Sequence, residues 1–241
     1  SGNSFTTLMA MEALFEGAKK MRINLETARG AVVGATGSIG RACALILSEQ
    51  VSVITLLGNP QHVVSSRNRL RSLSDDLFTY ARIRMQEGKT GGLAGWLNKT
   101  IRLLENNSSG YNEQLLNKYR SNDDLSAQLV EEICTSMNIP FPLETSLDND
   151  YSLPRCELIV AASNAPEYLV YKHHLSPGSV VCDVARPADV APEVYQQRDD
   201  VLVLEGGLVQ YPDDMAFGPN LGYRDGVSLA CLSETALLAL E

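Results

Sequence analysis

The chain has 241 residues, of which 44% are hydrophobic and 20% are charged, a composition typical of one elaborated globular domain. Its formal net charge of -9 argues against a nucleic-acid-binding protein. No apolar run approaches the about 20 residues that cross a bilayer, so we expect no integral membrane segment, and the lack of a signal-peptide pattern favours a cytoplasmic protein.

The first predicted elements are a helix and a strand. Residues 6–22 carry apolar side chains at three- and four-residue steps, which predicts an amphipathic helix covering a sheet. The apolar run 31–33 predicts a strand, and Gly34, Gly37 and Gly40 follow it at three-residue spacing. A helical pattern and a second strand-like run come next, so the glycines lie between a strand and a helix.

This strand, glycine turn and helix predict a dinucleotide-binding site. Gly34 turns the chain, Gly37 lets the backbone approach a pyrophosphate, and Gly40 lets the helix pack closely on the strand. The N–H groups and the positive dipole end of the helix then face an anion. We therefore expect Thr36, Ser38 and Ile39 to bind the cofactor as well. The alternative is a structural turn in an unrelated α/β protein.

The rest of the chain completes an α/β pattern with one interruption. Residues 73–139 hold mostly helical patterns broken by glycine- and asparagine-rich turns, which we interpret as a helical insertion. Short β-rich runs, typical of buried parallel strands, follow at 158–162, 179–184 and 201–204. We expect residues 1–241 to form a doubly wound, mostly parallel Rossmann-like sheet, with flanking N- and C-terminal helices and the insertion within it.

Ligands of such sheets sit beyond the carboxyl ends of the strands. Ser163 and Asn164 follow one late strand and Gly206 and Gly207 follow another, so we expect these four residues to bind the cofactor. For the two glycines, a plain strand-ending turn is an equal alternative. Asp183 either orients a substrate or bonds the loop backbone, and we favour the second role.

The end of the second strand indicates which nicotinamide cofactor is bound. Enzymes that use NAD tend to place a carboxylate there, whereas enzymes that use NADP place arginine or small polar groups. Asn59 stands at this end without an acidic neighbour, and Arg67 or Arg69 follows on a helix. We therefore favour NADP, with Asn59 and Arg67 as binding residues. The alternative for the arginines is a solvated helix face.

Cys231 is the sharpest candidate for chemistry. If Ser228 or Asp225 caps the last predicted helix, 228–240, Cys231 falls near its first turn, where the helix dipole favours a reactive thiolate. The alternative is a packing residue among leucines. The five cysteines lack paired spacing, which favours a reducing compartment. Neither they nor the three histidines show metal-ligand spacing, so we expect no metal.

Four segments, taken in order, resemble the long-chain acyl-[acyl-carrier-protein] reductase family: residues 1–7, 31–40, 204–209 and 230–238. The resemblance implies NADPH-dependent reduction of a fatty acyl thioester to an aldehyde. It also implies that Cys231 becomes acylated and releases the thiol of acyl carrier protein or coenzyme A. The family carries a histidine soon after the double glycine, where this chain has Gln210 and Tyr211. We interpret Tyr211 as a packing residue.

Other functions remain open at this stage. A similar domain also suits an NADP-dependent dehydrogenase of a small carbonyl compound or hydroxy acid, or a non-catalytic cofactor-binding module that docks within a larger protein. The chain begins at Ser1 without methionine, which leaves open a multidomain parent, and a homo-oligomer is also open. Basic residues of the insertion would either steer an acidic carrier protein or solvate a helical surface, and we favour the second: Arg82, Arg84, Lys89 and Lys99.

Overall fold

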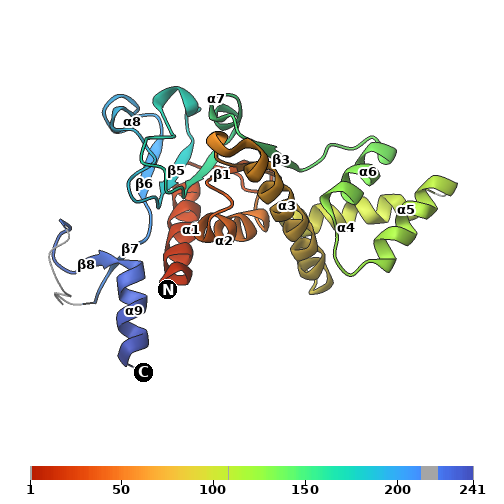
Figure 1. Ribbon diagram of the computed structural model, residues 1–241, viewed down its shortest axis with the longest axis horizontal. Coiled ribbons are helices and arrows are strands. Elements are labelled where there is room, and N and C mark those ends of the chain that lie inside the picture. The colour runs from red at the N-terminus through yellow and green to blue at the C-terminus, as the bar shows by residue number, and fades with distance from the viewer. Residues whose placement is uncertain (1, 108, 213–221, 241) are drawn as a thin grey trace.

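The computed structural model describes residues 2–107, 109–212 and 222–240, so Ser1 of the first resembling segment lies outside the described residues. Its centre is a parallel six-stranded sheet with the order β3-β2-β1-β4-β5-β6, and Figure 1 shows this sheet between two layers of helices and turns. The strands are β1 (Arg29–Val33), β2 (Val53–Leu57), β3 (Leu143–Ser146), β4 (Leu158–Ala161), β5 (Val180–Asp183) and β6 (Leu202–Glu205).

The strand order reverses between β1 and β4, which pair in parallel with Val33 opposite Ala161. This order is that of a doubly wound dinucleotide-binding sheet, whose ligand crevice lies at the carboxyl ends where the order reverses. The expected Rossmann-like α/β fold is therefore confirmed. The sequence did not predict β3, because Leu143–Ser146 is a short and half-polar edge strand.

One face of the sheet is covered by α1 (Asn3–Lys20), α2 (Ser38–Ser48) and α3 (Val63–Gln86). The predicted N-terminal helix is thus confirmed, and it packs on α2 and β5. Close approach is possible because Gly17 has no side chain: a Cβ there would lie 2.8 Å from Val180 Cγ1. Fully buried Leu14, Val32 and Ile54 belong to the core on this face.

The second face is covered by short elements rather than long helices. They are α7 (Asn149–Ser152), η2 (Leu153–Arg155), η3 (Lys172–His174) and α8 (Pro192–Gln197). Ala31, Val33 and Ile159, whose side chains alternate with those of the first face, pack beneath them in a second core. A further turn, η1 (Pro60–His62), joins β2 to α3.

The expected insertion lies in the connection between β2 and β3. It starts inside α3, which runs without a break through Leu73, and continues with α4 (Gly92–Glu105), α5 (Gly110–Ser121) and α6 (Ala127–Met137). Figure 1 shows α4, α5 and α6 gathered at the end of α3 away from the sheet. Leu97 of α4 and Leu115 of α5 share one apolar core with the sheet.

The chain leaves β6 into an antiparallel hairpin, β7 (Leu208–Gln210) with β8 (Val227–Leu229), and then α9 (Ala230–Leu240). The predicted C-terminal helix is confirmed from Ala230 onward. The prediction that Ser228 caps this helix is wrong, because Ser228 pairs with Val209 inside the hairpin. In the part of the chain that is described, no helix is long and apolar enough to cross a membrane.

Candidate functional site

The glycine-rich turn has the geometry that its spacing predicts. Gly34 adopts a left-handed φ of +71°, and a Cβ on it would lie 2.7 Å from Ser163 Cα. A Cβ on Gly40 would lie 2.3 Å from the Gly34 carbonyl oxygen. Both positions therefore require glycine, one for the turn and one for close contact between α2 and β1.

The start of α2 fits an anion. Gly37 is the residue before the helix and provides no side-chain cap, and Gly37 and Ser38 are exposed while Thr36 and Ile39 are half-buried. The first N–H groups of a helix lack partners within it. A pyrophosphate can accept from such groups and gains from the helix dipole, so these residues fit the group that the sequence predicts.

Asn59 and Arg67 lie at the far end of the same crevice, beyond β2. Asn59 Oδ1 accepts from the Gln61 N–H at 2.7 Å, which begins η1. Arg67 is exposed on α3 and lines an open cavity of about 1180 Å³ that reaches Ser146 at the end of β3. Among the described residues, no carboxylate lies within ion-pair distance of Arg67. The arginine is available for an anionic group there.

Ser163, in the loop after β4, is held by a carboxylate that the sequence analysis missed. Asp189 Oδ2 accepts from the Ser163 N–H at 2.9 Å, and Oδ1 accepts from its hydroxyl. Asp189 is fully buried, and burial raises the pKa of its carboxyl to about 6. Asn164, the next residue, is exposed at the mouth of the loop.

Asp183 bonds the loop backbone, the role that the sequence analysis favours. Its carboxylate accepts from the N–H groups of Ala185 at 3.0 Å and Val190 at 2.9 Å. The side chain is buried, and burial raises the pKa of its carboxyl. Asp183 and Asp189 together fix the loops after β4 and β5, and neither carboxylate is exposed to a substrate.

Gly206 and Gly207 form the turn between β6 and β7. A Cβ on Gly206 would lie 2.2 Å from Val184 Cγ1, and Gly207 has a φ of +72° with Thr6 of α1 at its side. Packing and turn geometry therefore explain both glycines. The Gly207 carbonyl accepts from the Ala230 N–H at 2.8 Å, which joins this turn to the start of α9.

Cys231, the second residue of α9, lies against the start of α1. A Cβ on Gly2 would lie 2.6 Å from Cys231 Cα and 2.7 Å from Cys231 Cβ. The next residue, Asn3, donates from Nδ2 to Ser38 Oγ at 3.0 Å. The first turn of α1 therefore touches both the thiol residue and the glycine-rich turn.

The N-termini of α1, α2 and α9 thus meet in one region, and Figure 1 shows α9 and the β7–β8 hairpin beside the N-terminus of α1. Each terminus carries partial positive charge, which favours anions. The structure brings together Ser38, Gly207 and Cys231 of the predicted site. Asn59 and Arg67 lie apart from them, beyond the end of β2.

Accessibility separates Cys231 from the other cysteines. Cys231 is half-buried, whereas Cys43, Cys134, Cys156 and Cys182 are buried. Burial raises the pKa of the Cys43 and Cys182 thiols to about 12 and that of Cys134 to about 11. Those thiols are held protonated inside the core, so the thiol available to a reagent is that of Cys231.

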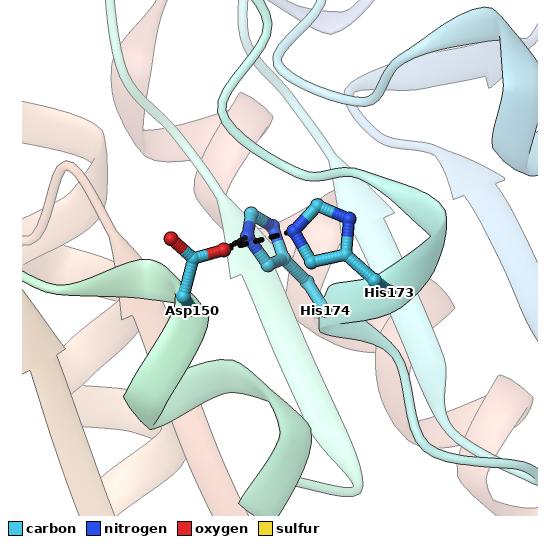
Figure 2. Close-up of side chains that lie close together, drawn as sticks. All are labelled: Asp150, His173 and His174. Atoms are coloured by element: carbon cyan, nitrogen blue, oxygen red, sulfur yellow. Dashed lines mark hydrogen bonds and ion pairs between the residues drawn. The ribbon is translucent and has the colours of Figure 1, made fainter.

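A second polar cluster lies on the other face of the sheet. Figure 2 shows His173 and His174 of η3 meeting Asp150 of α7, with Nε2 to Oδ1 distances of 2.8 and 2.9 Å. Sequence spacing did not reveal this cluster, because Asp150 is distant along the chain. His174 Nδ1 accepts from the Tyr171 N–H at 3.0 Å, so Nε2 carries the proton and donates to Asp150. A protonated Nε2 cannot bind a metal ion, and hydrogen bonding accounts for the cluster.

Two further expectations concern packing. Tyr211 bonds Ser233 of α9 through its hydroxyl, which ties the hairpin to the helix as a packing residue would. In the insertion, Arg84 pairs with Glu49 at 3.1 Å, and Arg82 binds the Asn122 carbonyl and stacks over Tyr119. These arginines support internal contacts, which agrees with the surface role that the sequence analysis favours over carrier steering.

The sequence analysis also missed Glu234. Its Oε2 accepts from the Phe5 N–H of α1 at 2.9 Å. Glu234 and Asn3 both lie within the resembling segments, but only the folded chain shows their partners, which are 229 and 35 residues away. No local spacing signals such contacts.

Comparison with known proteins gives a partial match. No family model matches the chain. The chain is 31% identical over 139 residues to the aminotransferase PigE of Serratia sp. (strain ATCC 39006), and this stretch covers 56% of this chain but 15% of that protein. The chain therefore spans a small part of the length of that relative.

Solved structures resemble the chain in fold alone. Dipicolinate synthase from Bacillus halodurans matches with a TM-score of 0.43 and 11% identity, over 85% of this chain and 46% of that one. Glutamyl-tRNA reductase from Methanopyrus kandleri matches with a TM-score of 0.41 and 16% identity, over 81% of this chain and 34% of that one.

Proposed function

We propose that this chain is an NADPH-dependent reductase that converts a fatty acyl thioester to an aldehyde, with Cys231 as the nucleophile. The observation that carries the proposal is the position of Cys231 against Gly2, whose neighbour Asn3 bonds Ser38 in the glycine-rich turn. An accessible thiol beside a turn that fits a pyrophosphate suits a reaction that needs both groups.

The thiolate of Cys231 attacks the thioester carbonyl carbon, and the carrier's sulfur leaves and takes a proton from water. Cys231 stands in the first turn of α9, where helix N–H groups without partners within the helix favour the developing oxyanion. Bound NADPH would supply a hydride to the carbonyl carbon. The hemithioacetal on Cys231 then collapses, the carbon–sulfur bond breaks, and the aldehyde leaves with the thiolate restored.

Cofactor choice follows from the crevice beyond β2. Arg67 lines the open cavity there, and an arginine suits a ribose 2′-phosphate through charge-assisted hydrogen bonds. Gly34, Thr36, Gly37, Ser38, Ile39 and Gly40 would hold the pyrophosphate, and Asn59 would contact the adenosine end. Ser163, Asn164, Gly206 and Gly207 would line the nicotinamide end.

An aldehyde product also fits the name of the matched relative. An aminotransferase converts a carbonyl group to an amine, and an aldehyde is a carbonyl compound of that class. We propose that acyl carrier protein or acyl coenzyme A supplies the thioester. Arg82 and Arg84 of the insertion serve internal contacts, so we do not place the carrier on them.

The test follows NADPH oxidation and aldehyde release from acyl thioesters of several chain lengths. The proposal predicts equal amounts of both products and loss of both in Cys231→Ser. Turnover of a keto acid that survives cysteine alkylation would instead identify a dehydrogenase of small carbonyl compounds. NADPH binding without turnover of thioesters, aldehydes or keto acids would identify a non-catalytic cofactor-binding module.

A further inference from the structure

We propose that the first turn of α1 fixes the thiol relative to the cofactor, with Asn3 and Glu234 as its positioning residues. This inference rests on the proposed function. It concerns a segment that contacts the glycine-rich turn on one side and α9 on the other, while contributing no reacting atom itself.

The contact with the glycine-rich turn is made by one side chain. Asn3 is half-buried, and its amide donates to Ser38 Oγ at 3.0 Å. Ser38 is the first residue of α2. Its hydroxyl is therefore the point at which α1 meets the proposed pyrophosphate site.

The contact with α9 is made by a charge. Gly2 precedes α1 and offers no side-chain cap, and the first turn of α1 holds no acidic residue. Glu234 of α9 supplies both, because its carboxylate accepts from the Phe5 N–H at 2.9 Å. A carboxylate at a helix N-terminus also gains from the helix dipole. The cap of α1 is thus borrowed from the helix that carries Cys231.

Two close contacts leave this arrangement little freedom. A Cβ on Gly2 would lie 2.6 Å from Cys231 Cα, and a Cβ on Gly207 would lie 3.0 Å from Thr6 Cγ2. Because backbone meets backbone, a shift of α1 moves α9 with it. Reacting groups displaced by about 1 Å can lose roughly a hundredfold in rate, so this turn controls the distance across which reduction occurs.

The experiment compares Asn3→Ala, Glu234→Ala and Glu234→Gln with two exposed controls, Asn117→Ala on α5 and Glu12→Ala on α1. Each variant is checked for folding by thermal denaturation. Three quantities are then measured separately on the protein: NADPH affinity, the rate of Cys231 acylation by an acyl thioester, and the single-turnover rate of NADPH oxidation by the acylated enzyme.

We expect Asn3→Ala to slow NADPH oxidation by roughly ten- to a hundredfold, while acylation changes little and NADPH affinity changes by no more than a few-fold. Glu234→Ala slows both acylation and oxidation. Glu234→Gln recovers most of the loss, since its amide oxygen still accepts from the Phe5 N–H. Both controls match the unmodified chain. Equal loss in NADPH affinity and oxidation, or no loss in either variant, overturns the inference.

A second readout does not depend on thioester chemistry. If the unmodified chain forms no acyl-enzyme, the proposed function fails, and the rate of Cys231 alkylation with and without NADPH decides the inference. We expect NADPH to change this rate severalfold in the unmodified chain and not in Asn3→Ala. A change that persists in Asn3→Ala, or that is absent from the unmodified chain, contradicts the bridge.

Discussion

Asp189 shows how a buried acid can organise a binding loop without touching a ligand. Both of its oxygens accept from Ser163, so the loop after β4 is held by a residue that follows β5. Burying a carboxylate costs free energy unless hydrogen bonds compensate it. The raised pKa of about 6 shows that the compensation is incomplete.

This raised pKa predicts a pH dependence of stability. Between pH about 4 and 6 the folded chain keeps the Asp189 proton that the unfolded chain has lost. The stabilisation is therefore complete below the unfolded pKa and is lost as pH rises through about 6. From pH 4 to 7, the unfolding free energy of the unmodified chain should fall by about 3 kcal/mol relative to Asp189→Asn. Urea titrations at both pH values measure it, and parallel changes in the two proteins would reject it.

Gly40 provides a second residue-scale prediction. In Gly40→Ala the new Cβ would meet the Gly34 carbonyl oxygen at 2.3 Å, so the turn must shift. We expect a loss of about 1 to 3 kcal/mol in unfolding free energy and weaker NADPH binding. The matched control is Gly110→Ala at the start of α5, where a Cβ meets nothing within 4 Å. Equal effects of the two substitutions on urea unfolding would show that the contact is unimportant.

At the scale of elements, the sequence predicted most of the sheet and the glycine turn, because both have local signals. Apolar runs marked β1, β2, β4, β5 and β6, and glycine spacing marked the start of α2. The edge strand β3 and the β7–β8 hairpin escaped prediction, since short half-exposed strands lack an apolar run. The contacts of Asn3 and Glu234 escaped because they join distant segments.

The start of α3 allows a test of cofactor choice. Arg67 lines the open cavity beyond β2, so Arg67→Gln should weaken NADPH binding by roughly ten- to a hundredfold, the worth of about 1.5 to 3 kcal/mol for a charged hydrogen bond. NADH binding should not change, because NADH lacks the 2′-phosphate. Titration calorimetry with both nucleotides measures this, with Arg69→Gln as the control on the same helix. Equal weakening for NADPH and NADH would argue against a phosphate contact.

At the scale of the whole molecule, the thiols are divided between the core and one helix end. Cys43, Cys134, Cys156 and Cys182 are buried, and Cys231 is half-buried. Iodoacetamide should therefore modify the folded chain once, at Cys231, and the unfolded chain at all five cysteines. Peptide mass spectrometry at pH 8 with and without urea locates the labels. Rapid labelling of another cysteine in the folded chain would contradict the packing described above.

The central claim is that Cys231 carries the acyl group which the neighbouring cofactor reduces, and intact-mass spectrometry tests it most directly. Incubation with an acyl thioester should add one acyl group to the chain and none to Cys231→Ser. Addition of NADPH should then remove this mass with release of one equivalent of aldehyde. An adduct that survives in Cys231→Ser, or one that NADPH leaves in place, would contradict the account.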